Sequence, residues 1–217
     1  MRLRLTSAGA LFAALILPAI CFAAKLASLI PPPPGAKVAI VVFEDLEWPD
    51  CATVNPVLEE AAKAHNVPLM VHDFPLPRHT WSFQAAVNAR FFEAESQKLG
   101  DEFRGYIFQN QKLIGDEAAL QQFTAKFAQE KQVTLPTVLD PDGKLTEAVK
   151  ADFHLGQRIG VEHTPTVFVV SGSGAAIPFV ETIDRQKLDR VIEEMQKKAG
   201  TAVQAKPVAK KGRVEKR

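Results

Sequence analysis

The chain has 217 residues, of which 47% are hydrophobic and 24% are charged. This composition is typical of a globular protein with one substantial core, and it excludes a chain that is disordered throughout. The formal net charge is +1; without Arg2 and Arg4, 24 basic residues face 25 acidic ones, a net charge of −1. The strongly basic surface that a nucleic-acid partner requires is therefore not expected.

The first 23 residues have the pattern of a secretory signal peptide. Two arginines give a positive start, residues 8–20 are mostly apolar, and small residues precede a cleavage site after Ala23. The apolar run is shorter than the ~20 residues that a membrane-spanning helix needs. Lipid attachment at Cys21 is the alternative interpretation, and Ile20 is a poor fit to it because such a site needs a small residue there.

The next segments predict a linker, a strand and a helix. Residues 24–36 contain four consecutive prolines, which favour an extended linker and cannot join a sheet ladder. Residues 37–43 form an apolar, β-branched run without alternation, as in a central strand covered on both faces. A helix over residues 49–65 follows, with Pro49 at a favourable first position and a kink expected at Pro56.

Residues 67–74 predict a second strand, parallel to the first because a helix joins them, in a right-handed βαβ unit. From residue 80 to residue 155 the pattern is helical, without strand alternation. The expected helices cover residues 81–99, 102–109, 116–131 and 144–154, with breaks at Gly100, Gly115 and residues 141–143.

The last part of the chain returns to strands. Residues 164–170 predict a strand and residues 176–180 its hairpin partner. Asp184 is expected to cap a helix that ends near residue 198. The buried side of that helix is expected to carry Leu188, Val191, Ile192 and Met195. The basic tail, residues 199–217, is predicted to be disordered and solvated, with a contact to anionic lipid as the alternative.

The junction between the first strand and its helix carries a resemblance to a known family. Residues 43–51 read FEDLEWPDC, which is similar to the F-x-D-x-x-C-P-x-C pattern of the DsbA-like branch of the thioredoxin superfamily. Residues 73–79, DFPLPRH, resemble a passage that these proteins carry after the second strand. The resemblance covers residues 36–198. It implies a thioredoxin-like α/β fold, with βαβ and ββα halves, in which residues 80–155 form an inserted helical subdomain.

The family's attacking cysteine is replaced by Trp48 in this chain. In a C-x-x-C site the first cysteine lies at a helix N-terminus, where its pKa is lowered, and attacks a substrate disulfide; the second cysteine resolves the product. Cys51 matches the resolving position and is the only cysteine beyond the leader. The resemblance therefore implies at most monothiol exchange, because one thiol cannot form an internal disulfide.

Two residues of the motif each allow two interpretations. Cys51 is either a small buried hydrophobe or a thiol that forms mixed disulfides with a partner. Trp48 either covers Cys51 or offers its ring to a bound peptide. Pro49 and Asp50 complete the candidate site.

A second match lies in residues 160–166, GVEHTPT, which resemble the family's G-V-x-G-T-P-T, where the proline is cis and faces the C-x-x-C loop. The resemblance implies that the backbone of Thr164, next to Pro165, pairs with an extended substrate segment. His163 stands where the family has glycine.

Three acidic residues lie near the motif. Asp45 is either a proton relay for Cys51 or a structural turn residue. Glu44 and Glu47 flank the loop, and their negative charges are expected to disfavour a thiolate.

The sequence thus predicts an exported, periplasmic or extracellular relative of the thiol–disulfide oxidoreductases. The rival hypothesis is a redox-silent, chaperone-like module for extended polypeptide, and a third is a transferase that binds a small thiol such as glutathione. The expected partner is an unfolded polypeptide or a thiol-containing protein. No cofactor or metal is expected, because the five histidines are scattered without ligand spacing.

Overall fold

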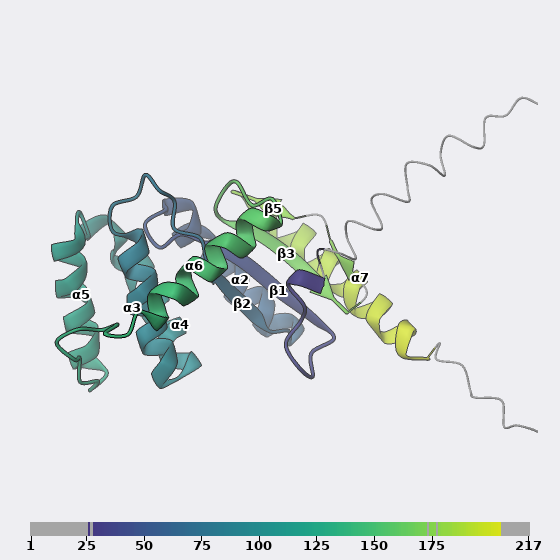
Figure 1. Ribbon diagram of the computed structural model, residues 1–217. Helices are drawn as coiled ribbons and strands as arrows, with labels where there is room; N and C mark the ends of the chain where they lie inside the picture. The colour runs from purple at the N-terminus through teal and green to yellow at the C-terminus, as the bar shows by residue number, and fades with distance from the viewer. Residues whose placement is uncertain (1–25, 27, 173, 177, 205–217) are drawn as a thin grey trace, which may run out of the picture.

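The computed structural model describes residues 26, 28–172, 174–176 and 178–204. Its sheet is built around β1 (Val38–Glu44), which pairs in parallel with β2 (Leu69–Asp73) and antiparallel with β3 (Thr166–Ser171). Beyond β3 lie the short strands β4 (Gly174–Ala175) and β5 (Phe179–Val180), both antiparallel to it. The strand order β2-β1-β3-β4 and the mixed pairing confirm the predicted α/β fold class (Figure 1).

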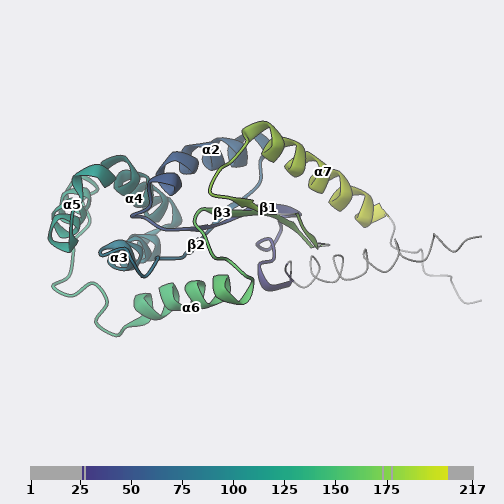
Figure 2. The ribbon, with the colours of Figure 1, turned by 90° about the horizontal axis from the view of Figure 1, so that it is seen from above.

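Helices cover both faces of the sheet. Figure 2 shows α2 (Pro49–His65) and α7 (Arg185–Gln204) on one side and α6 (Lys144–Arg158) on the other. All seven residues of β1 are buried, and its side chains alternate between the two cores. Val38, Ile40 and Val42 face α2 and α7, whereas Ala39, Val41 and Phe43 face the α6 side. The apolar run without alternation is therefore a central strand buried on both faces, as predicted.

The inserted helices form a subdomain with a core of its own. It contains α3 (Ser82–Glu95), α4 (Gln97–Asn110) and α5 (Glu117–Glu130), with a single 3₁₀ turn, η1 (Gln111–Leu113), after α4. These helices and α6 confirm the predicted helical insertion. Aromatic rings fill its interior: Phe92, Phe103 and Phe127 pack with centroid distances of 4.6 to 5.2 Å.

The break between the first two inserted helices lies at Ser96, not at Gly100 as the sequence suggested. Ser96 is extended, and its side chain accepts a hydrogen bond from the N–H of Leu99, so it caps α4. Gly100 lies inside α4 against α3. A Cβ there would be 2.7 Å from the Cβ of Glu93. Gly100 therefore allows α3 and α4 to approach each other closely, and it does not end a helix.

Both ends of the described chain differ from the expected linker and tail. Leu26 and Ile30 are 5% and 1% exposed and pack in the core on the α6 side of the sheet, so part of the proline-containing segment belongs to the domain. Helix α7 begins after Asp184, whose side chain accepts from the N–H of Lys187, and it continues to Gln204. The predicted leader and the last thirteen residues of the tail (205–217) lie outside the described residues. No helix within the described part is long and apolar enough to cross a membrane.

Candidate functional site

The loop between β1 and α2 places the motif residues at one end of the central strand. Trp48 is extended (φ −89°, ψ 123°) and immediately precedes α2, whose first residue is Pro49. The carbonyl oxygen of Trp48 accepts from the N–H groups of Cys51 (3.1 Å) and Ala52 (3.3 Å). Position 48 thus lies at the positive end of the helix dipole, where an attacking cysteine would be activated. Pro49 is exposed and Asp50 is half-buried.

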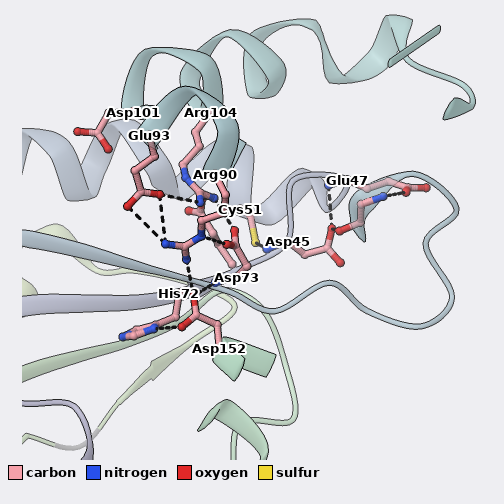
Figure 3. A network of polar contacts seen from close by, with 12 residues as sticks. Asp45, Glu47, Cys51, His72, Asp73, Arg90, Glu93, Asp101, Arg104 and Asp152 are labelled. Carbon is pink, nitrogen blue, oxygen red and sulfur yellow. Dashed lines mark hydrogen bonds and ion pairs between the residues drawn. The ribbon is translucent and has the colours of Figure 1, made fainter. Parts of the chain in front are cut away.

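The side chain of Cys51 points into the protein. It is 2% exposed and packs with Leu46 and Trp81 in the core of the helical insertion. Its sulfur accepts a hydrogen bond from the backbone N–H of Asp45 at 3.4 Å (Figure 3). Burial raises the pKa of the Cys51 thiol well above its ordinary value; the Asp45 N–H opposes this shift and the charge of Glu44 adds to it. The native thiol is therefore protonated and shielded.

The ring of Trp48 contacts two side chains of the β2–α3 loop. It stacks on the His79 ring at a centroid distance of 5.5 Å, and the Arg78 guanidinium carbon is 4.8 Å from its centroid. The ring is half-buried against the same cluster that holds Cys51. A stacked cation and a stacked imidazole fix this ring in place.

The Asp45 carboxylate is occupied by donors from the surrounding loop. Its oxygens accept from the N–H of Glu47 (2.8 Å), the N–H of Leu76 (2.6 Å), the His79 ring (2.7 Å) and the hydroxyl of Ser82 (2.5 Å). This geometry is that of a structural turn residue that fastens two loops together. A proton relay from Asp45 stays a prediction, because only its backbone N–H contacts the sulfur.

The two neighbouring glutamates have different surroundings. Glu47 accepts from the N–H groups of Trp81 (2.8 Å) and Ser82 (3.0 Å), so its charge faces the N-terminus of α3. Glu44 is buried, and its charge raises the pKa of Cys51. The predicted repulsion between thiolate and carboxylate therefore has a structural basis at Glu44.

Thr164 and Pro165 lie close to the buried sulfur. The peptide bond between them is cis. Thr164 is 2% exposed, and its side chain lies near enough to Cys51 to oppose the rise in the thiol pKa. Thr164 precedes β3, and its backbone N–H and C=O have no partner among the described residues. Exposed His163 forms an ion-pair contact with Glu181 at 3.2 Å.

A hollow of about 330 Å³ lies beside this loop. Residues of the loop and of β3 and β5 line it, among them His163, Thr166 and Val180. Val180 is 42% exposed, which is high for a large apolar side chain. The unpaired backbone of Thr164 thus lies near a partly apolar hollow.

Sequence reasoning missed a buried charge cluster beside the site (Figure 3). Arg104 is 3% exposed and donates to Asp73 (2.7 Å) and Glu44 (3.3 Å). Arg90 donates to Asp73 at 2.6 Å and also binds Asp152. The Asp152 carboxylate accepts a further hydrogen bond from the His72 ring at 2.7 Å. The cluster joins β1 and β2 to α3, α4 and α6. The sequence pattern indicated no role for Arg104, because its partners Asp73 and Glu44 lie 31 and 60 residues away in the chain.

The cluster shifts the pKa values of two of its carboxyl groups, Glu44 and Asp73, in opposite directions. Burial raises the pKa of Glu44 to about 7, against the attraction of Arg104. Burial also acts to raise the pKa of Asp73, but the guanidinium groups of Arg104 and Arg90 lower it overall. At neutral pH the folded protein therefore holds Asp73 ionised and Glu44 close to its midpoint.

We expect Glu44→Gln to flatten the pH dependence of stability between about pH 4.5 and 7. Because the folded pKa of Glu44 is raised from 4.5 to about 7, its protonated form stabilises the parent below pH 4.5, and this contribution is lost as the pH rises to 7. Chemical denaturation at several pH values measures the slope. The matched control is Glu147→Gln on the exposed face of α6, where the slope should stay as in the parent. An unchanged slope in Glu44→Gln would contradict the assignment.

No three His, Cys, Asp or Glu side chains in the described ranges are grouped so that they could hold a metal ion. What the site brings together is one shielded thiol, a fixed indole at the helix N-terminus, and an unpaired backbone segment at Thr164. Two-electron dithiol exchange needs a second sulfur, and Cys51 is the only free cysteine of the described residues.

The family model described as thioredoxin matches residues 33–173. The chain belongs to the thioredoxin family. A search of curated proteins found no match.

Solved structures of the DsbA and ScsC types share the fold. The thiol-disulfide exchange protein alpha-DsbA2 from Wolbachia pipientis is 15% identical with a TM-score of 0.66, over 82% of this chain and 98% of that one. ScsC from Proteus mirabilis is 17% identical with a TM-score of 0.62, over 87% and 89%. A periplasmic thioredoxin-like protein from Salmonella enterica serovar Typhimurium is 20% identical with a TM-score of 0.58, over 78% and 94%. These likenesses confirm the DsbA-like fold with its helical insertion.

Proposed function

We propose that this chain is an exported, DsbA-like member of the thioredoxin family that binds extended polypeptide without catalysing dithiol exchange. One observation carries the proposal: an indole occupies the helix N-terminus at position 48, while the single sulfur of Cys51 is 2% exposed. Binding needs neither group as a nucleophile. The unpaired backbone of Thr164, beside the hollow at Val180, supports the addition of a short partner strand.

Monothiol exchange through Cys51 is the second candidate. It is favoured because Cys51 lies close to Thr164, where a partner strand would bind. In that reaction the deprotonated sulfur attacks one sulfur of a substrate disulfide. The substrate S–S bond breaks, a mixed disulfide forms, and the leaving thiolate takes up a proton. Release then needs a thiol from a second molecule. Both the burial of Cys51 and its raised pKa slow the first step.

Export is the third part of the proposal. Residues 1–23 have the charge and hydropathy pattern of a signal peptide, and a structural neighbour from Salmonella is described as periplasmic. A cut after Ala23 leaves Leu26 and Ile30, which pack in the core.

In the chain without residues 1–23, which holds no other cysteine, we expect the Cys51 thiol to react with a thiol reagent about a hundredfold more slowly in the folded protein than in denaturant. That factor corresponds to a free energy of about 3 kcal/mol for opening the structure around the thiol. The physical reason is its burial with a raised pKa. The matched control is a thiol at the exposed position 148 of α6, made as Ala148→Cys in a Cys51→Ala background. That thiol should react at the same rate in both conditions. Rapid labelling of native Cys51 would favour the monothiol candidate.

The same Cys51→Ala variant tests the binding function directly. Carboxymethylated α-lactalbumin is permanently unfolded and has no free thiol, so it cannot exchange disulfides. We expect the parent and Cys51→Ala to bind it with equal affinity in fluorescence anisotropy. Binding that is lost with the sulfur would contradict the redox-silent proposal.

A further inference from the structure

A second hollow, of about 310 Å³, lies between the β2–α3 loop and α6. We call it the Phe83 groove. Its lining consists of Pro75, Leu76, Pro77, His79, Phe83, Lys150 and Phe153. None of these residues belongs to the 160–166 loop or to β5. The groove is therefore separate from the surface formed by the Thr164 backbone and the hollow at Val180, which we call the Thr164 edge. His79 connects it to the candidate site, because its ring also stacks on Trp48.

The walls of the Phe83 groove are preformed. The N–H of Leu76 donates to buried Asp45 at 2.6 Å, and the N–H of His79 donates to the carbonyl of Leu76 at 2.9 Å. Two prolines fix the φ angles of this loop. On the opposite wall Phe153 stacks on Phe74 with a centroid distance of 4.6 Å. A ligand therefore meets a surface that needs little ordering when it binds.

The groove offers apolar surface to solvent. Phe83 is 39% exposed although it lies on the first turn of α3, next to buried Trp81 and Ser82. Four of the seven lining residues are proline or phenylalanine. Such concave apolar surface favours the burial of an apolar side chain.

The β2–α3 loop and α6 each carry an exposed basic side chain next to the groove, Arg78 and Lys150. Arg78 is exposed, lies over the Trp48 ring and has no carboxylate partner among the described residues. Lys150 is paired with Glu147 at 2.9 Å, but the lysine side chain is still 49% exposed. Of the other nearby carboxylates, Asp45 is buried and Glu47 faces the N-terminus of α3. The groove therefore complements an anionic ligand.

We propose that the Phe83 groove docks an extended segment of a partner protein in which an apolar side chain, such as phenylalanine, is flanked by aspartate or glutamate. The apolar side chain lies between Phe83 and Phe153, and the carboxylates face Arg78 and Lys150. This docking does not involve Cys51, so it stands independently of any thiol exchange.

Three fluorescein-labelled peptides and the full chain test the proposal by fluorescence anisotropy. The first is a Gly/Ser peptide with a central Asp-Phe-Glu; the others carry Asp-Ser-Glu or Lys-Phe-Lys at the same place. We expect the Asp-Phe-Glu peptide to bind at least about tenfold more tightly than either, because each of the others lacks one complementary feature. Equal binding of the Lys-Phe-Lys peptide would overturn the charge assignment, and equal binding of the Asp-Ser-Glu peptide would overturn the apolar one.

Five variants locate the peptide. Phe83→Ser and Lys150→Glu should each weaken binding about tenfold or more. The matched controls are Leu113→Ser, at an apolar side chain that is 69% exposed, and Lys126→Glu, at a lysine that also has a glutamate one turn away. Both controls should bind as the parent does. Absence of binding by the parent, or unchanged binding by Phe83→Ser and Lys150→Glu, overturns the proposal. Binding that is lost in Val180→Ser but kept in Phe83→Ser places the peptide at the Thr164 edge and also overturns it.

Discussion

Replacing Trp48 with cysteine should convert this chain into a dithiol catalyst of insulin reduction. Position 48 directly precedes α2 at the positive end of its dipole, where a thiol pKa is lowered. Positions 48 and 51 then have the spacing of a C-x-x-C pair at a helix N-terminus, in which the first thiol attacks and the second resolves. We expect the rate of insulin reduction to be at least about a hundredfold above that of the parent, because gaining or losing a covalent nucleophile changes an enzyme's rate by at least that factor.

Two further variants separate the new thiol from the lost indole. Trp48→Ser removes the same stacking on His79 and Arg78 but supplies no nucleophile, so it should stay as inactive as the parent. Trp48→Cys combined with Cys51→Ala has an attacker without a resolver and should accumulate mixed disulfides with substrate. A parent that already catalyses insulin reduction at a dithiol rate would contradict our account of the site.

The scaffold was predictable because its signals are local. The buried run in β1 and the helical start at Pro49 follow from a few consecutive residues, and the structure confirms both. The resemblance around residues 43–51 and 160–166 placed the strand–helix junction and the Thr164 loop correctly in the chain. Local signals failed where packing overrides them. Gly100 was predicted to break a helix, but its missing side chain allows α3 and α4 to approach each other.

The surroundings of the site residues were not predictable, because their partners lie far away in the sequence. The donors to Asp45 include Leu76, His79 and Ser82, which are more than 30 residues away. The burial of Cys51 depends on Trp81 and other side chains of the helical insertion, so the sequence left two interpretations open. A helix pattern shows which residues share a face, but it does not show which distant element covers that face.

The buried charge cluster leads to the second large effect, which we expect in Arg104→Met. Arg104 bridges Asp73 on β2 and Glu44 on β1 from its place on α4. Removing the guanidinium leaves Glu44 without its ionic partner in a buried site, and Asp73 with Arg90 alone. Breaking a buried ion pair in this way costs about 3–5 kcal/mol of unfolding free energy. Urea denaturation measures the loss. The matched control is Arg185→Met, whose partner Asp189 is 31% exposed, and its cost should stay below about 1 kcal/mol.

The pH dependence of this loss distinguishes an electrostatic cause from a packing defect. Arg104 lowers the pKa of both Glu44 and Asp73 in the folded protein. Without it both folded pKa values rise, so the folded variant binds more protons than the folded parent, and its stability falls relative to the parent as the pH rises. The difference in unfolding free energy should therefore be largest at neutral pH and should shrink toward pH 4, where the unfolded carboxyl groups also take up protons. A loss that is equal at pH 4 and pH 8 would mean that Arg104 acts through its packed side-chain volume, and that the carboxylates beside Cys51 do not depend on its charge.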